Sequence, residues 1–311
     1  MPQNQKHHLE TMGSQGKNTL NPKADSARKK AVFIDLDGTL WDREAVPASA
    51  WKAIEKARAN GHLIFVNTGR RHVDIPQFLW DADFDGYCLA TGMQMFKGKE
   101  LLCQSYIDPE KVNKMITYLK SQDSGYGLEG NDWGFDDPKY AFRRMIFFAK
   151  EDRKDPSLRY PLSHIEPENY DELVKIIFDS DKPYDLEPVA RELGFDIIQY
   201  KNRFNPSGGA GSFFRGELTD VHHNKAMAME EMLEAMGVSG QYDIAAIGDS
   251  ENDIPMLEAA DYAICMGNGT SATKEKADYV TTSLDQNGLY NALAWLGLFE
   301  PEKNTKENEH D

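Results

Sequence analysis

The feature that most constrains this fold is a repeated unit, in which a short apolar run is followed by a turn and a helix-like stretch. The run AVFIDL at 31–36 precedes the amphipathic stretch ASAWKAIEKARANG, which ends at Gly61. HLIFVN, GYCLA, YDIAAIG, DYAICM and DYVTT have the same strand-like form, and a helix is expected over about 71–80. Nearly continuous apolar strands that alternate with helices indicate a parallel sheet covered on both faces. The sequence therefore predicts an α/β fold with a Rossmann-like parallel sheet.

The middle of the chain has a different pattern. It predicts helices at PEKVNKMITYLKS, ENYDELVKIIFDS and EPVARELG, and strands at RRMIFFAK and FDIIQYK. We therefore expect residues 107–215 to form a second, α+β domain, inserted into a core domain made of residues 31–106 and 216–299. Residues 1–30 are expected to be a disordered or artificially added arm, and the polar residues 300–311 a disordered tail.

Composition excludes several classes of partner. The formal net charge of −16 predicts repulsion of nucleic acid and of anionic membrane surfaces. No apolar run is long enough for a membrane-spanning helix, and the start of the chain lacks the apolar segment of a signal peptide. Cys88, Cys103 and Cys265 lie in apolar contexts and are interpreted as reduced core residues. We expect a cytoplasmic protein, and its oligomeric state stays open.

Two carboxylates follow the first predicted strand in the segment DLDGT. Alternate side chains of a strand point the same way, so Asp35 and Asp37 are expected to face one spot. At a separation of ~7 Å and an effective dielectric of ~20, their repulsion is roughly 2 kcal/mol. A divalent cation such as Mg²⁺ would cancel it, and Gly38 would allow a sharp turn. The alternative is a pair of solvated turn aspartates.

Two further segments suit an anionic group. In VNTGR, the hydroxyl of Thr68 and the N–H of Gly69 could bind phosphate, although Thr-Gly after a strand is also an ordinary helix N-cap. Lys225 is expected near the start of a helix, where its charge opposes the helix dipole unless it neutralises a phosphoryl group or an aspartate. The adjacent His222 and His223 are interpreted as surface or capping residues.

The fourth segment, GDSENDIPML, is the most specific. Asp249 ends a predicted buried strand, and Asn252 and Asp253 follow at the start of a helix, so both aspartates could approach one ion. The alternative is acidic capping of that helix. GNGTSA at 267–272 matches a dinucleotide-binding pattern, but the helical piece after it is too short for that use.

Together these four segments resemble the motifs of the haloacid dehalogenase (HAD) superfamily of phosphohydrolases. A short stretch separates Asp37 from Thr68 and a long one separates Thr68 from Lys225, which is similar to the Cof-type branch, subfamily IIB. The resemblance implies a HAD-fold core with an inserted cap domain. It also implies a Mg²⁺-dependent phosphatase that hydrolyses a small phosphorylated metabolite, a sugar phosphate, through an aspartyl-phosphate intermediate.

The resemblance also implies residue roles. Asp35 would be the nucleophile and Asp37 the general acid and base. The residues implied to bind the phosphoryl group are Thr68, Gly69, Lys225 and Asn252. The implied Mg²⁺ ligands are Asp35, Asp37 through its backbone carbonyl, Asp249 and Asp253. Guesses for cap residues that select the substrate are Arg143, Arg144, Trp133 and Lys201. Two alternatives stay open, a phosphomutase that uses the same aspartyl phosphate and a catalytically inactive binding module.

Overall fold

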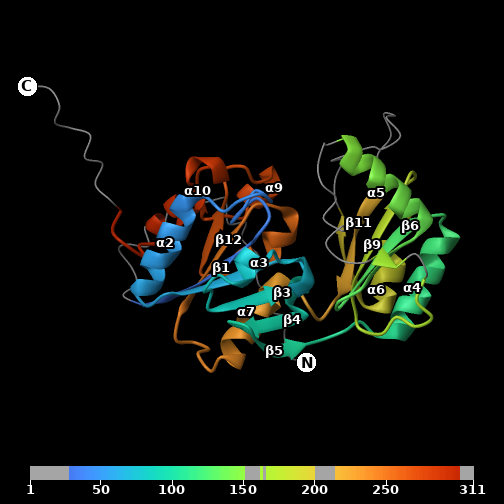
Figure 1. Cartoon of the computed structure of the whole chain (residues 1–311), viewed down its shortest axis with the longest axis horizontal. Coiled ribbons are helices and arrows are strands. Elements are labelled where there is room, and N and C mark those ends of the chain that lie inside the picture. Colours follow the sequence, from blue (N-terminus) through green and yellow to red (C-terminus); the bar gives the residue numbers. More distant parts are fainter. Residues whose placement is uncertain (1–27, 151–161, 164–165, 200–213, 302–311) are drawn as a thin grey trace, which may run out of the picture.

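The computed structural model describes residues 28–150, 162–163, 166–199 and 214–301. The described strands form two sheets, an eight-stranded one in one half of the molecule and a six-stranded one in the other (Figure 1). The predictions made for most of the N-terminal arm, for most of the C-terminal tail and for Lys201 concern residues outside this described part.

The larger sheet has the order β14-β13-β12-β1-β2-β3-β4-β5. Its strands are β1 (Lys30–Ile34), β2 (Leu63–Asn67), β3 (Gly86–Leu89), β4 (Gln94–Lys97), β5 (Glu100–Gln104), β12 (Asp243–Gly248), β13 (Tyr262–Cys265) and β14 (Tyr279–Val280). Every pairing from β14 to β3 is parallel, whereas β4 and β5 add an antiparallel edge. The predicted parallel α/β core is confirmed.

Helices cover both faces of this sheet, and alternate residues of β1 show why its apolar run is continuous. Val32 and Ile34 pack with α2 (Ala48–Ala59) and α10 (Gly288–Trp295). Ala31 and Phe33 pack on the opposite face with α7 (Lys225–Ala235) and α8 (Ile254–Ala259). The remaining helical elements of this half are η1 (His72–Asp74), α3 (Gln77–Trp80), η2 (Ala90–Gly92), η4 (Glu251–Asp253), α9 (Ser271–Lys274) and η5 (Leu284–Gln286).

The smaller sheet has the order β10-β11-β9-β6-β7-β8 and is antiparallel except for the β7–β8 pair. Its strands are β6 (Gly125–Gly130), β7 (Gly134–Asp136), β8 (Leu162–Ser163), β9 (Leu173–Ser180), β10 (Phe195–Gln199) and β11 (Phe214–Asp220). Its helices are α4 (Pro109–Ser121), α5 (Pro138–Lys150) and α6 (Glu187–Leu193). Residues of α4 and α6 form an apolar core with one face of the sheet, and Tyr140 of α5 lies against Gly127 of β6 on the other.

Two predicted elements of this half are wrong. The run RRMIFFAK, expected as a strand, continues helix α5, which begins at Pro138. The Asp137 carboxylate accepts the N–H of Tyr140 at 3.0 Å, an N-terminal helix signal that the prediction overlooked. The stretch ENYDELVKIIFDS, expected as a helix, contains the central strand β9, because pairing with both β6 and β11 outweighs local helical spacing.

Three predicted boundaries also change. The helix expected over about 71–80 is only the turn η1 and the short α3, because Pro76 interrupts it. Lys30, assigned to the arm, begins β1 and is buried. The domain boundary expected between 215 and 216 falls inside β11, which pairs with β9 and β10, so the chain leaves the smaller sheet only after Asp220.

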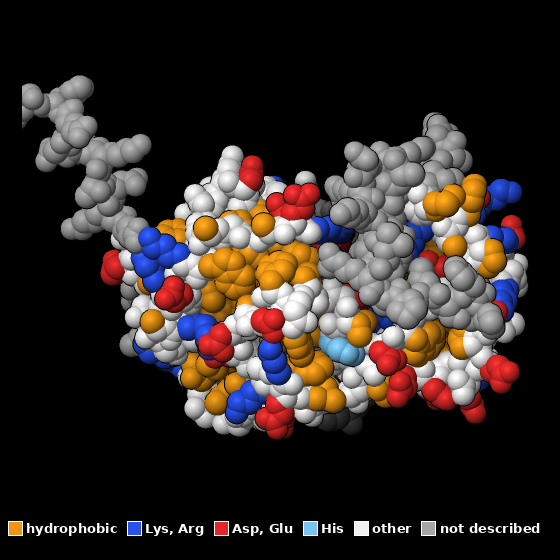
Figure 2. Space-filling view, viewed as in Figure 1, with side chains coloured by type: hydrophobic (Ala, Val, Ile, Leu, Met, Phe, Trp, Pro, Cys, Tyr) orange, Lys and Arg blue, Asp and Glu red, His pale blue; other side chains and the backbone are white. Residues whose placement is uncertain are grey.

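Three further observations concern membrane-spanning helices, the cysteines and the surface. In the described part of the chain, no helix is both long and apolar enough to cross a membrane. All three cysteines are free thiols. Figure 2 shows one face of the molecule, and hydrophobic side chains gather there on the half that contains the larger sheet. Exposed hydrophobic side chains are common on folded proteins, and these assign no partner by themselves.

Candidate active site

Three neighbouring parallel strands bring the predicted motifs to one edge of the larger sheet. Strand β12 lies beside β1, and β1 lies beside β2. Asp35 directly follows β1, Thr68 follows β2 and Asp249 follows β12. Because the strands are parallel, their carboxyl ends meet, as the sequence argument required.

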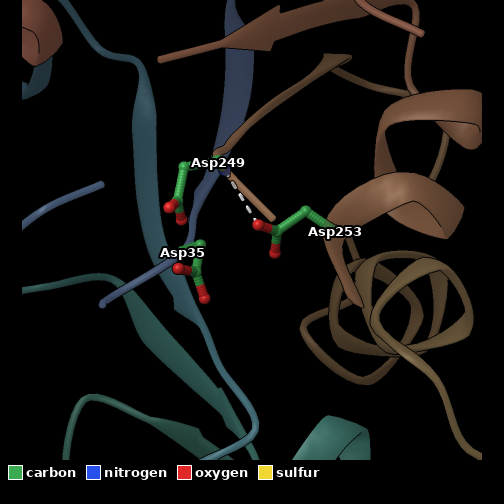
Figure 3. A group of neighbouring side chains, drawn as sticks. All are labelled: Asp35, Asp249 and Asp253. Atoms are coloured by element: carbon green, nitrogen blue, oxygen red, sulfur yellow. Dashed lines mark hydrogen bonds between the residues drawn. The ribbon is translucent and has the colours of Figure 1, made fainter. Parts of the chain in front are cut away.

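Asp35, Asp249 and Asp253 form a buried acidic group at this edge. One carboxylate oxygen from each residue lies within 4.8 Å of the others, and Figure 3 shows the three side chains converging. Asp253 is fixed by its own loop, since its Oδ2 accepts the backbone N–H groups of Asp249 and Ser250 at 2.9 Å each. The predicted convergence of Asp249 and Asp253 is therefore a property of the turn that joins β12 to α8.

Lys225 neutralises part of this group. It is the first residue of α7, whose N-cap Asn224 accepts the N–H groups of Ala226 and Met227. The buried Lys225 Nζ lies 2.5 Å from Asp35 Oδ1 and 2.5 Å from Asp253 Oδ1. Burial alone would lower the pKa of Lys225, but the two carboxylates raise it. The unfavourable position of this charge at a helix start is thus offset by direct contact with aspartates.

The electrostatics of the group suit a divalent cation. Burial and then the Asp253 carboxylate raise the pKa of Asp35 well above its ordinary value, although Lys225 opposes the shift. Lys225 contacts two of the three carboxylates, and both Asp253 and Asp249 raise the pKa of Asp35, so an excess of mutual repulsion arises when all three are ionised. A hard cation with oxygen ligands relieves such an excess. The donor set of Asp35, Asp249 and Asp253 therefore fits Mg²⁺ chemically.

The Asp37 carboxylate lies outside the acidic group and contacts two arginines. Strand β1 ends at Ile34, so strand alternation does not extend to these two residues. Arg70 donates from Nε and Nη2 to Asp37 at 2.6 and 2.7 Å, and Arg43 donates at 3.0 Å. Burial would raise the pKa of Asp37, but the two arginines together lower it. The sequence shows Arg70 next to Gly69 but gives no sign of this pairing.

The predicted phosphate-binding residues lie on the loops that surround the group. Thr68 is buried, and its Oγ1 accepts the N–H of Arg70 at 3.3 Å. The Gly69 carbonyl accepts a hydrogen bond from Lys175 at 3.2 Å. Asn252 lies in η4, where its Oδ1 accepts the Ser250 hydroxyl at 2.6 Å.

Two contacts with Asp249 that the sequence does not reveal shape the acidic group. Thr39 Oγ1 donates to Asp249 Oδ1 at 3.3 Å. Gly38 has a φ of +86°, and a Cβ added at this position by substitution would lie only 2.6 Å from Asp249 Oδ2. The GNGTSA segment supports the same loops, since Asn268 donates to the Gly38 carbonyl and the Thr270 N–H to the Asp249 carbonyl. That segment thus contacts both the DLDGT segment and the loop after β12.

The guessed cap residues have partners of their own. Arg143 pairs with Asp179 at 2.6 Å, and Arg144 pairs with Asp136 at 2.6 Å. The Trp133 carbonyl accepts a hydrogen bond from Arg71 at 2.6 Å. These contacts assign Arg143 and Arg144 to ion pairs within the smaller sheet and its helix.

The sequence of this chain is similar to those of known phosphatases. The family model of haloacid dehalogenase-like hydrolases matches residues 32–293. A phosphoglycolate phosphatase of Archaeoglobus fulgidus is 35% identical over 273 residues, which cover 87% of this chain and 98% of that protein. The 5-amino-6-(5-phospho-D-ribitylamino)uracil phosphatase YwtE of Bacillus subtilis is 29% identical over 283 residues, which cover 84% of this chain and 95% of that protein.

Solved structures share the fold. A HAD subclass IIB sugar phosphatase aligns with a TM-score of 0.68 at 24% identity, covering 87% of this chain and all of that one. A HAD-superfamily phosphatase from Bacteroides thetaiotaomicron aligns with a TM-score of 0.70 at 23% identity, covering 91% of this chain and all of that one.

Proposed function

The chain belongs to the haloacid dehalogenase-like hydrolases and is a phosphatase, and from that premise we propose that it is a Mg²⁺-dependent phosphomonoester hydrolase that uses an aspartyl-phosphate intermediate. The single observation that carries the proposal is the buried group of Asp35, Asp249 and Asp253 with Lys225 in contact with two of its members. Such a site suits a reaction that transfers a highly charged phosphoryl group.

In the first step the Asp35 carboxylate attacks phosphorus, a bond from Asp35 to phosphorus forms and the bond to the leaving oxygen breaks. Lys225 holds Asp35 Oδ1, so attack falls to Oδ2. Asp37 donates a proton to the leaving alcohol and then accepts one from the water that releases inorganic phosphate and restores Asp35. The lowered pKa keeps Asp37 ionised, which is the form that accepts a proton in the second role, whereas the first role requires that Asp37 be protonated.

The other proposed residues bind and orient. Thr68, Gly69 and Asn252 would contact the phosphoryl oxygens from the surrounding loops, and Lys225 would add a positive charge. Mg²⁺, when bound, would supply charge neutralisation, with Asp35, Asp249, Asp253 and the Asp37 carbonyl as its proposed ligands.

We propose a small phosphorylated metabolite, a sugar phosphate, as the substrate. The names of the two curated relatives and of the IIB sugar phosphatase support a small phosphate ester. Residues 107–220 are proposed as a cap over a core made of residues 30–106 and 221–299, with the cap excluding water and selecting the leaving group. A cytoplasmic location belongs to the same proposal, supported by the three free thiols.

The test is phosphate release from p-nitrophenyl phosphate and from a panel of sugar phosphates, nucleotides, pyridoxal phosphate and flavin mononucleotide, with Mg²⁺ and with EDTA. We expect Mg²⁺-dependent turnover and one orthophosphate per substrate consumed. Substrate loss without orthophosphate would identify a mutase, and absence of turnover on every ester would leave a binding module.

A further inference from the structure

Arg71 joins the loop after β2 to the smaller sheet. Its Nη1 donates to the carbonyls of Gly130 and Trp133, at 2.7 and 2.6 Å, and these two residues close the turn between β6 and β7. Its Nε and Nη2 donate to the Asp74 carboxylate at 2.8 and 3.3 Å. The Arg71 side chain has 0% exposure, so this cation depends on those oxygens in place of water.

Lys175 makes a contact in the opposite direction, from the smaller sheet to the loop after β2. It lies on β9 opposite Glu129 of β6, and its Nζ is 3.0 Å from the Glu129 carboxylate and 3.4 Å from that of Glu217. The same Nζ donates to the carbonyl of Gly69, in the loop after β2, at 3.2 Å. Lys175 is buried, and although burial would lower its pKa, Glu129 and Glu217 raise it. A charged lysine of the smaller sheet thus reaches the loop that carries Thr68.

A third contact runs beside these two. Gln94 of β4 is fully buried, and its Nε2 donates to the side-chain oxygen of Asn131 in the β6–β7 turn at 2.9 Å. The His72 N–H donates to Gln94 Oε1 at 2.9 Å. The segment from Gly69 to His72 and the β6–β7 turn therefore meet through buried polar groups.

We infer that Arg71 and Lys175 are positioning residues that form a clasp between the proposed cap and the loop beside the active site. Gly69 and Arg71, the two points of attachment, flank Arg70, which holds Asp37. A shift of the cap therefore moves the backbone on both sides of the residue that orients the proposed general acid. Because the clasp is made of charges and carbonyls, water can replace its partners when the cap opens, which an apolar contact would not allow.

The clasp differs from a role of Lys175 in direct substrate binding. If Lys175 contacted the leaving group, its loss would change the order of preference among substrates, and loss of Arg71 would not reproduce that change. In a clasp, breaking either attachment loosens the same contact between the smaller sheet and the loop after β2, so the two substitutions have similar and non-additive effects.

The test compares Arg71→Met, Lys175→Met and the double variant. The matched control is Arg58→Met, since Arg58 also pairs with two carboxylates, those of Asp83 and Asp85, away from the β6–β7 turn. Hydrogen exchange of the wild-type and variant proteins is measured over 125–136, which include the turn. We expect either single variant to speed exchange at 130–134 by about tenfold or more, the double variant no further, and the control not at all.

The kinetic arm alone rests on the proposed function. For a sugar phosphate, whose alkoxide leaves poorly, we expect kcat to fall about tenfold in either variant, and for p-nitrophenyl phosphate less than about threefold. Arg71→Lys, which keeps the charge with fewer donors, should fall between wild type and Arg71→Met, and it replaces the methionine variant if that fails to fold. Unchanged exchange at the turn, multiplicative effects in the double variant, or an altered substrate order in Lys175→Met only would overturn the clasp. Absence of all turnover would overturn the phosphatase proposal and leave the exchange result to decide the clasp.

Discussion

Replacing Lys225 with methionine removes the cation from the buried acidic group, and we expect the metal-free protein to lose about 3–5 kcal/mol of stability. At an effective dielectric of ~20, each of the two 2.5 Å contacts contributes roughly 7 kcal/mol of attraction. The desolvation of a buried ammonium group offsets several kcal/mol of this. The loss of stability in the variant is limited because Asp35, whose pKa is already raised, can take up a proton.

Thermal unfolding in EDTA and in Mg²⁺ measures the effect. We expect the Tm of Lys225→Met in EDTA to fall on the order of 6–10 °C. Mg²⁺ should raise the Tm of the variant by more than it raises that of the wild type, because the added cation replaces the missing charge beside Asp35 and Asp253. Equal Mg²⁺ responses in the two proteins would refute the reasoning.

The control is Lys276→Met, which breaks an ion pair with Glu258 of similar length, 2.6 Å, at the surface. Exposed pairs of this kind contribute little, so we expect no resolvable change in Tm and the wild-type response to Mg²⁺. If both lysine variants lose the same stability, burial of the acidic group is not the cause.

Asp35→Asn should lower phosphate release at least about a thousandfold while the Tm of the metal-free protein holds or rises, because a buried carboxylate with a raised pKa is removed; near-wild-type kcat would contradict the nucleophile assignment. Gly38→Ala should cost about 1–3 kcal/mol in urea unfolding and weaken the Mg²⁺-induced Tm shift, because of its φ of +86° and the approach to Asp249. Burial lowers the pKa of His62 from 6.5 to about 4, so the unfolded chain binds a proton first as the pH falls. The free energy of unfolding should therefore drop by up to about 3 kcal/mol between pH 6.5 and 4, and His62→Gln should flatten that dependence.

The core could be predicted because its sequence signals agree with its packing. Val32 and Ile34 face one helical layer and Ala31 and Phe33 the other, so a continuous apolar run had one consistent interpretation. The smaller sheet could not be predicted as well. The stretch that contains β9 satisfies helical spacing locally, and only pairing with β6 and β11, which are distant in sequence, selects the strand.

The contrast between local signals and contacts distant in sequence also decides which parts of the site could be predicted. The meeting of Asp35 with Asp249 and Asp253 followed from the rule that parallel strands end at one edge. The pairing of Arg70 with Asp37 and the contacts of Arg71 and Lys175 did not, because they depend on side-chain directions in loops and on the placement of a second sheet. No periodic pattern marks such contacts in one sequence.

The two aspartates of the DLDGT segment lie in different environments although only one residue separates them. Strand β1 stops at Ile34, before both aspartates, and Gly38 follows them in a backbone conformation that favours glycine. Burial and neighbouring carboxylates raise the pKa of Asp35, whereas Arg70 and Arg43 lower that of Asp37. A cation at Asp35 would reverse the first shift by adding positive charge, whereas the second depends on the two arginines. The pKa values of these two identical side chains thus shift in opposite directions, and the proposed nucleophilic role of Asp35 depends on a cation that would lower its pKa.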